Sequence, residues 1–381
     1  MVMRLSSCIS SFVLWRWHVD NLQRHDNKKD RKAKDWIIKM IKLQELLDQQ
    51  EKEKSEYKVA ICVTSYNQIN YIEKALTSLL HQKTDFPYLI VVGDDCSTDG
   101  SCELLKSIQK DNSDRVKILF QSKNVGLFQN RKSIFLQCDA PYIAFCDGDD
   151  YWIDDTVLQK KVDFLEAHKE YIGYQTACFF EQDGKISETT DLGERGCFVD
   201  FSQKEALNNA YPGQVGGFFF RNVYRYMTKE DFETYTAVRI DDSGKLPIFA
   251  ATIAPIYRQD KMPTFVYRYC DGSMSRQEEK RNMCEQLFYS HLMYQDMLTS
   301  LKIDLKMNID AQLMELIVNA FITAVKTTLR SDGADNREQF LKLYHDGHFA
   351  KKEIRSGIRK EIWRRGIEKY RNVMCMHRIM K

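Results

Sequence analysis

Four short apolar runs alternate with segments of helical periodicity between residues 58 and 146, and this alternation limits the fold more than any other feature of the chain. The runs are 59–64, 88–93, 116–120 and 142–146. The first of them, 59–64, is a continuous apolar run, as in a parallel strand that is buried on both faces. A strand and a helix recurring about every thirty residues predict an α/β fold with a mostly parallel sheet, flanking helices and right-handed crossovers.

Three of these runs end in polar clusters, at 64–66, 94–95 and 147–150. Ligands of parallel sheets bind beyond the carboxyl ends of the strands, so we expect the three clusters to converge on one crevice. No G-x-G-x-x-G follows the first run, and no G-x-x-x-x-G-K-[ST] occurs in the chain. A dinucleotide site or a P-loop is therefore not expected.

The segment 145–152 (FCDGDDYW) places three carboxylates within four positions, directly after an apolar run. Buried carboxylates are unfavourable unless they are paired or bound to a metal ion. Oxygen ligands at the end of a strand suit Mg²⁺ or Mn²⁺, which complete their shell with water and substrate phosphates. The segment predicts a metal–diphosphate site. The alternative interpretation is an acidic turn, because Asp-Gly is common in turns.

Composition narrows the class of protein. The formal net charge is only +2, so we expect no nucleic-acid partner. The eleven cysteines include no C-x-x-C pair, which indicates a reducing compartment, and we expect a cytoplasmic protein. No stretch approaches eighteen apolar residues, so no transmembrane helix is expected.

Four motifs, in order, resemble those of the family 2 glycosyltransferases, which use nucleotide-sugar donors on a GT-A (Rossmann-like) fold. They are VTSYN at 63–67, VGDDCSTD at 92–99, N-V-G with a following arginine at 124–131, and FCDGDDYW at 145–152. A fifth stretch, 266–275, resembles the closing Y-R-x-h-x-x-S-x-S element of the family. The resemblance covers about 58–275, more than half of the chain.

The resemblance implies two groups of ligand-binding residues. The nucleotide-sugar donor is expected to contact Thr64, Tyr66, Asp94, Asp95, Arg131, Asp147 and Asp150. Mn²⁺ or Mg²⁺ is expected to bind Asp149 directly, with Asp147 beside it. Within the first group, Asp95 is expected to hydrogen-bond the base, while Asp94 supports the turn.

Inverting sugar transfer also needs a general base on the acceptor hydroxyl, on the side opposite the leaving nucleotide. The family places an acidic residue ahead of an apolar helix for this purpose. The sequence R-I-D-D-S-G-K precedes the apolar segment 246–251, so we expect Asp242 to be the base, with Asp241 second. A solvated acidic turn is the alternative.

The chain is expected to divide into a charged helical extension (1–57), the GT-A domain (58–275) and a helical C-terminal region (276–381). Residues 351–381 hold eleven Lys and Arg against three Glu, an excess of 11 − 3 = +8. Apolar positions at helical spacing accompany this charge. The end 350–381 is therefore expected either to contact an anionic membrane peripherally, on its inner face, or to pack on its own domain.

The predicted function is transfer of a sugar from a nucleotide-diphosphate sugar to a glycan or lipid-linked acceptor, with inversion, in cell-surface polysaccharide synthesis. Two alternatives stay open. A nucleotidyltransferase would need a glycine-rich, basic first loop, which 64–68 lacks. A non-catalytic sugar-binding or scaffolding protein is favoured only by Lys245, which stands where the family often has its acid. The sequence specifies neither sugar, acceptor nor oligomeric state.

Overall fold

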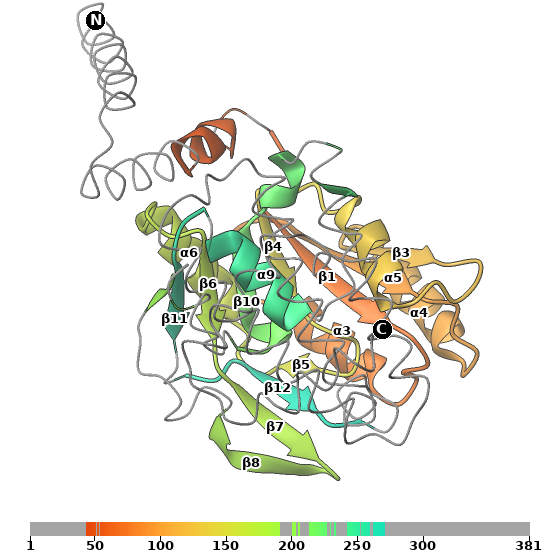
Figure 1. The fold of residues 1–381 in the computed structure, drawn as a ribbon. Helices are drawn as coiled ribbons and strands as arrows, with labels where there is room; N and C mark the ends of the chain where they lie inside the picture. The colour runs from red at the N-terminus through yellow and green to blue at the C-terminus, as the bar shows by residue number, and fades with distance from the viewer. Residues whose placement is uncertain are drawn as a thin grey trace, which may run out of the picture. The chain divides into compact units, whose positions relative to one another are not determined.

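The computed structural model describes residues 43–50, 54–190, 200–202, 213–226, 242–251, 253–259 and 262–270, and positions 52, 205, 229, 232 and 233 (Figure 1). The chain forms two compact units, Met1–Glu53 and Lys54–Lys381. In the first unit, residues 43–50 form a helix, within the predicted helical extension. All the elements below belong to the second unit.

Strand β1 (Val59–Ser65) lies inside an eight-stranded sheet of order β3-β2-β1-β4-β10-β6-β11-β9. It pairs in parallel with β2 (Tyr88–Asp94) and β4 (Tyr142–Phe145), and β2 pairs in parallel with β3 (Val116–Phe120). Every residue of β1 is buried, which accounts for its continuous apolar sequence. The four predicted strands and their parallel pairing are confirmed.

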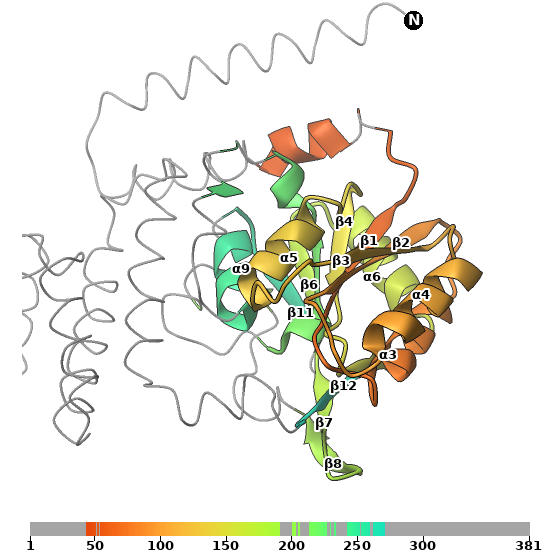
Figure 2. The same ribbon diagram turned by 90° about the vertical axis from the view of Figure 1, so that its right-hand side faces the viewer.

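Helices cover both faces of this sheet (Figure 2). On one face, α3 (Ile72–Leu80), α4 (Ser101–Asp111) and α6 (Val157–Ala167) pack into a single apolar core with the strands. The buried residues of α3 recur at helical spacing. On the other face lie α5 (Leu127–Phe135) and α9 (Asp242–Ala251), where Phe135 packs edge-on against Phe145 of β4.

The second half of the domain adds shorter, largely antiparallel strands. Strand β10 (Phe218–Arg221) follows the turn η1 (Val215–Gly217) and runs antiparallel between β4 and β6 (Gly173–Thr176). The turn η2 (Val223–Tyr226) comes next, and β11 (Ile256–Gln259) and β9 (Asp200–Phe201) complete the sheet. The large sheet is thus mixed, with its parallel core at the first half of the chain.

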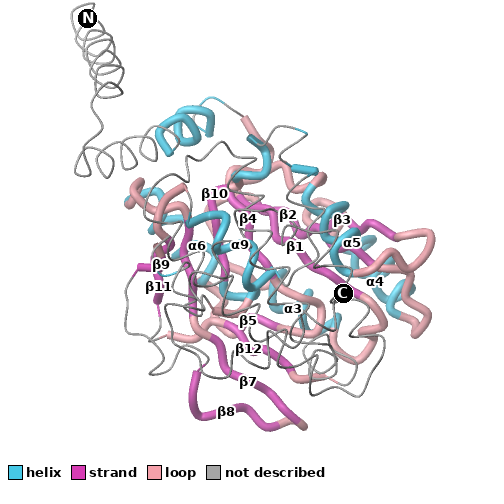
Figure 3. Tube along the Cα trace, viewed as in Figure 1, coloured by secondary structure: helices cyan, strands magenta, loops and turns pink. Residues whose placement is uncertain are grey.

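A second sheet has the order β5-β12-β7-β8. It contains β5 (Tyr151–Trp152), β7 (Cys178–Gln182), β8 (Lys185–Thr190) and β12 (Phe265–Arg268). The β7–β8 hairpin extends from the domain (Figure 3). Because β12 pairs with β5, which directly follows the acidic segment, this sheet brings distant residues next to that segment.

Within the described ranges, no helix combines the length and apolarity needed to cross a bilayer. The predicted helical region 276–381, including the basic end 350–381, lies outside the described residues, as does most of the extension 1–57. The membrane contact predicted for 350–381 therefore stays a prediction.

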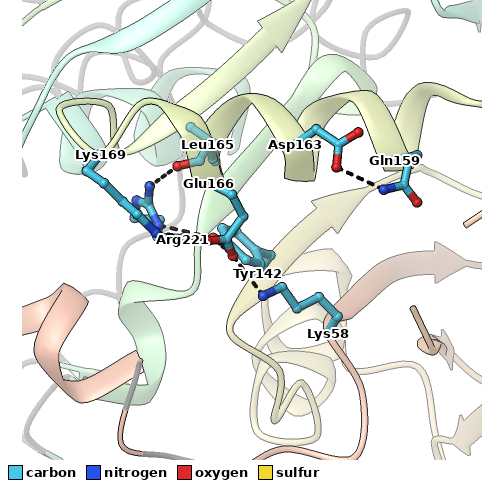
Figure 4. A network of polar contacts seen from close by, with 8 residues as sticks. All are labelled: Lys58, Tyr142, Gln159, Asp163, Leu165, Glu166, Lys169 and Arg221. Carbon is cyan, nitrogen blue, oxygen red and sulfur yellow. Dashed lines mark hydrogen bonds and ion pairs between the residues drawn. The ribbon is translucent and has the colours of Figure 1, made fainter. Parts of the chain in front are cut away.

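A buried arginine joins β10 to the elements around it (Figure 4). Arg221 is fully buried, and its guanidinium donates to Tyr171 O at 3.1 Å and to the Tyr142 hydroxyl at 3.1 Å. The Tyr142 hydroxyl in turn donates to Glu166 at 2.7 Å, and the same carboxylate accepts from Lys169 at 2.8 Å. Arg221 thus supplies donors to several buried acceptors at the edge of the sheet far from the polar strand ends.

Replacing Arg221 with Gln is expected to lower the free energy of unfolding by about 3 kcal/mol, because buried acceptors lose their donors. Lys169→Met is the control, since an exposed ion pair contributes at most about 1 kcal/mol. Urea denaturation measures both variants. Losses of equal size would show that Arg221 does not hold the network together.

Candidate active site

The loops after β1, β2 and β4 are joined to one another at the carboxyl edge of the parallel strands. The N–H of Asp95 donates to Ser65 O at 2.9 Å, and the N–H of Gly148 donates to Thr64 O at 2.8 Å. The end of β1 therefore lies between the loops after β2 and β4. The polar clusters that the sequence predicted to converge do meet at one edge of the sheet.

Gly148 lets the acidic loop, residues 147–150, run close to β1. A Cβ at this position would lie 2.8 Å from Thr64 O, which is shorter than side-chain contacts allow. Glycine is the residue that permits such a close backbone approach. The acidic loop is consequently held against the end of β1 by its own main chain.

Three predicted site residues form one contact group. The Thr64 hydroxyl donates to Asp147 Oδ1 at 2.5 Å, and Arg131 Nη2 donates to the same oxygen at 2.5 Å. Arg131 comes from α5 and is only 3% exposed, while the Asp147 side chain is 29% exposed. A buried guanidinium thus fixes one oxygen of Asp147 and leaves the carboxylate open to the crevice. Arg131 reaches the acidic loop from α5, which lies on the face of the sheet opposite α3.

Asp94 and Asp95 are buried, and each carboxylate holds a loop. Asp94 accepts hydrogen bonds from the N–H and hydroxyl of Ser97, at 3.0 and 2.6 Å, as expected for a residue that supports the turn. Asp95 accepts from the N–H groups of Val125 and Gly126, at 2.7 and 2.8 Å. Gly126 has a φ of +83°, which favours glycine. The predicted contact of Asp95 with a base stays a prediction.

Tyr66 lies just after β1, on a loop that is braced by hydrogen bonds. The residue is 48% exposed. The next residue, Asn67, binds the loop after β2 twice: its N–H donates to Ser97 Oγ at 2.9 Å, and its Oδ1 accepts from Thr98 N at 2.8 Å. An exposed aromatic ring on a fixed loop is suited to stacking on a planar ligand.

The other two carboxyl groups of the acidic loop, Asp149 and Asp150, are in surroundings that disfavour their charged forms. Burial, followed by repulsion from Asp147, raises the pKa of Asp149 to about 7. Burial and both neighbouring carboxylates raise the pKa of Asp150 well above its usual value, although the N–H of Arg268 donates to Asp150 at 2.9 Å. A positive charge placed among these three groups would relieve the repulsion.

The residues present fit a divalent cation. The donor set is carboxylate oxygen, which is what Mg²⁺ and Mn²⁺ prefer. Among the described residues, no three Asp, Glu, His or Cys side chains form a metal cage by themselves. That agrees with a cation held by one or two carboxylates whose shell is completed by substrate phosphates. Asp149 and Asp147 are the residues that would hold it.

The residues proposed as general base cannot be placed against this site. Asp242 is the first residue of α9, and its side chain is outside the described part of the chain. Asp241 lies outside the described residues, and so does 271–275, the end of the predicted closing element. Their roles stay predictions.

Sequence reasoning did not single out the residues that support the acidic loop from sheet β5-β12-β7-β8. The carboxylate of Glu181 accepts a hydrogen bond from the Tyr151 hydroxyl at 3.0 Å and faces Arg268 Nε at 3.4 Å. Arg268 lies within the predicted closing stretch, 266–275, but no role was predicted for it. The short strands give no local signal of this pairing, because β5 has two residues and β12 has four.

Known proteins resemble the chain in sequence and in fold. Residues 60–227 match the family model described as glycosyl transferase family 2. TuaG of Bacillus subtilis, named for teichuronic acid biosynthesis as a glycosyltransferase, is 31% identical over 126 residues, covering 33% of this chain and 49% of TuaG. The Campylobacter jejuni protein named GalNAc(5)-diNAcBac-PP-undecaprenol beta-1,3-glucosyltransferase is 28% identical over 173 residues, covering 44% of this chain and 52% of that protein.

The chain therefore spans about half the length of these curated relatives. Among solved structures, residues 1–349 of S. aureus TarS in complex with UDP superpose with a TM-score of 0.53 at 16% identity, covering 76% of this chain and 79% of that one. This likeness concerns the fold alone, and it confirms the predicted α/β class.

Replacing Asp149 with Asn is expected to stabilise the metal-free protein at about pH 8. A carboxyl whose pKa is raised on folding binds its proton more tightly in the folded state. The free energy of unfolding therefore falls as the pH rises from the pKa of the unfolded state, near 4, to the pKa of the folded state, about 7. The free energy of unfolding of Asp149→Asn does not fall in this way. It should exceed that of the wild type by on the order of 2 kcal/mol at pH 8, and this difference should become smaller towards pH 5.

Urea denaturation with a chelator, at several pH values, measures this difference. Asp163→Asn, at an exposed position of α6, is the control and should follow the wild type at every pH. Parallel pH profiles for wild type and Asp149→Asn would contradict the strained acidic loop.

Proposed function

We propose that this chain, whose residues 60–227 match the model of glycosyl transferase family 2, moves a sugar from a nucleotide-diphosphate sugar to an acceptor hydroxyl with inversion. The observation that carries the proposal is the acidic loop. Thr64 and Arg131 hold its first carboxylate, Asp147, at the carboxyl edge of a parallel sheet, and the repulsion among its three carboxylates calls for a cation. Such a cation would be Mn²⁺ or Mg²⁺.

The named relatives support a class of acceptor. TuaG carries the name of a teichuronic acid biosynthesis enzyme, and the Campylobacter protein is named for an undecaprenol-linked glycan. We therefore favour a glycan or lipid-linked acceptor and a role in cell-surface polysaccharide synthesis. The TarS structure was solved with UDP, which makes UDP-sugars the first donors to test.

Each residue of the crevice has a task in this reaction. A cation held by Asp149 and Asp147 would supply positive charge to the departing diphosphate. Arg131 and Thr64 fix one oxygen of Asp147, so the carboxylate keeps its direction without a rearrangement during the reaction. Fixing the ligands before the substrate arrives lowers the cost of reaching the transition state.

The nucleoside is expected to lie over the loops after β1 and β2. Tyr66 is exposed there on its braced loop, and Thr64 and Asp95 stand at the strand ends. Asp94 holds the second of these loops. Asp150, whose carboxylate accepts the N–H of Arg268, would orient the donor sugar or its neighbours in the acidic loop.

The proton of the acceptor hydroxyl needs an acceptor outside the acidic loop, because those carboxylates are committed to the leaving group. We assign this step to Asp242, with Asp241 second. Asp242 begins α9, which lies on the same face of the sheet as α5 (Figure 2). In this scheme, Asp242 takes the proton of the acceptor hydroxyl, whose oxygen bonds to the anomeric carbon of the sugar while the bond from that carbon to the nucleoside diphosphate breaks on the opposite face.

The first test is hydrolysis of a panel of nucleotide sugars by wild type and Asp149→Asn, each with Mn²⁺, with Mg²⁺ and with chelator. Wild type is expected to hydrolyse at least one donor only with metal, and the variant to lose more than about 100-fold of that rate. Asp163→Asn should retain it. Metal-independent hydrolysis, or an active Asp149→Asn, would reject the site.

A second test separates the base from the donor site. Asp242→Asn is expected to lower transfer to acceptor by roughly 10²–10⁴-fold, the usual contribution of a general base. Binding of UDP with Mn²⁺ should not change. Full transfer activity in Asp242→Asn, with loss in Asp241→Asn, would move the role to Asp241. Full activity in both would exclude this segment.

A further inference from the structure

Arg268 of β12 contacts two residues of the acidic loop, Asp149 and Asp150. It is the last residue of β12 and only 6% exposed. Its N–H donates to Asp150 Oδ1 at 2.9 Å, and its Nη1 donates to Asp149 O at 3.0 Å. One residue therefore holds the side chain of Asp150 and the main chain of Asp149 together.

The guanidinium of Arg268 is itself fixed on three sides. Its carbon lies 4.4 Å from the centre of the Tyr151 ring, and Nε lies 3.4 Å from Glu181 Oε2. The Tyr151 hydroxyl donates to that same Glu181 oxygen at 3.0 Å. Lys74 Nζ lies 3.6 Å from the centre of the Tyr151 ring, so two cations hold this ring. The guanidinium consequently has little freedom to turn away from the acidic loop.

The chemistry of the group matters to this arrangement. A guanidinium is planar, stays charged and presents several donors in a rigid fork, so it reaches a carbonyl, a carboxylate and an aromatic face at once. A lysine ammonium has neither the plane nor the fork. The stack on Tyr151 fixes the direction from which Nη1 meets Asp149 O, and with it the course of the main chain that carries the Asp149 carboxylate.

We infer that Arg268 is a positioning residue, which sets the direction of the Asp149 carboxylate through the main chain of the acidic loop. The inference rests on the proposed function, in which Asp149 holds the cation. Arg131 fixes the carboxylate of Asp147, while the N–H of Arg268 fixes the carboxylate of Asp150 and the Arg268 guanidinium holds the main chain of Asp149. Partners that orient a metal ligand typically change metal affinity by about 10- to 100-fold when they are removed.

The test compares Arg268→Gln, Arg268→Lys and Glu181→Gln with Arg221→Gln, a matched substitution of a buried arginine in the network of Figure 4. Mn²⁺ affinity is measured in the presence of UDP, by electron paramagnetic resonance of the free ion. UDP affinity without metal and the melting temperature are measured in parallel. These readouts separate orientation of the loop from general loss of stability.

Arg268→Gln and Arg268→Lys are both expected to weaken Mn²⁺ binding by about 10- to 100-fold, with UDP affinity in the absence of metal unchanged. Glu181→Gln should weaken it less, because it loosens the guanidinium without removing it. Arg221→Gln should lower the melting temperature and keep the Mn²⁺ affinity of wild type.

Three results would overturn the inference. Wild-type Mn²⁺ affinity in folded Arg268→Gln would show that the loop keeps its course without the guanidinium. Wild-type Mn²⁺ affinity in Arg268→Lys would show that only the positive charge of Arg268 matters, and not the shape of its guanidinium. A loss in Arg221→Gln equal to that in Arg268→Gln would indicate general destabilisation. A fourth result, UDP binding by the wild type that Mn²⁺ does not change, would reject the proposed function as well. It is seen in the wild type alone, so it can be told apart from the other three results.

Discussion

The structure depends above all on the crowding of three carboxylates within four residues at the end of β4. Desolvation, followed by repulsion from the neighbouring carboxylates, raises the pKa of Asp149 and Asp150. The protein compensates only in part, with Arg131 and Thr64 on Asp147 and the N–H of Arg268 on Asp150. Perturbed carboxyl groups of this kind are common where a protein binds charge or carries out chemistry. A divalent cation bound together with a diphosphate would neutralise the negative charge that these contacts leave uncompensated.

The two halves of the domain each bring one arginine to this loop. The parallel half supplies Arg131 on α5, sixteen residues before its partner Asp147. The antiparallel half supplies Arg268 on β12, 118 residues after its partner Asp150. β12 reaches the loop because it pairs with β5, the short strand that directly follows the loop. The second sheet therefore does more than extend the domain: through Arg268 it contacts the acidic loop, and it links that contact to Glu181 on the projecting β7–β8 hairpin (Figure 1).

Local patterns were enough to predict the parallel core. Buried parallel strands are largely apolar, so β1, β2 and β4 stood out from the sequence, and β3 followed from its place in the strand–helix alternation. The polar clusters at the ends of β1, β2 and β4 marked the edge where the loops meet. The turn-supporting role of Asp94 was predicted from the family resemblance, and its carboxylate accepts hydrogen bonds from Ser97 in that turn. The support from Arg268 and Glu181 was not predictable, because it depends on strands of two to five residues whose pairing carries no periodic signal. The binding of Asp95 to the N–H groups of Val125 and Gly126 was equally hidden, since main-chain donors have no sequence signature.

The central claim is that the acidic loop binds a cation together with a nucleoside diphosphate. Isothermal titration of UDP and GDP into the wild-type protein, with and without Mn²⁺, tests it most directly. The account predicts that at least one nucleotide binds ten times more tightly or better with Mn²⁺, a difference of about 1.4 kcal/mol or more. Equal affinity with and without the metal, for a nucleotide that does bind, would contradict it.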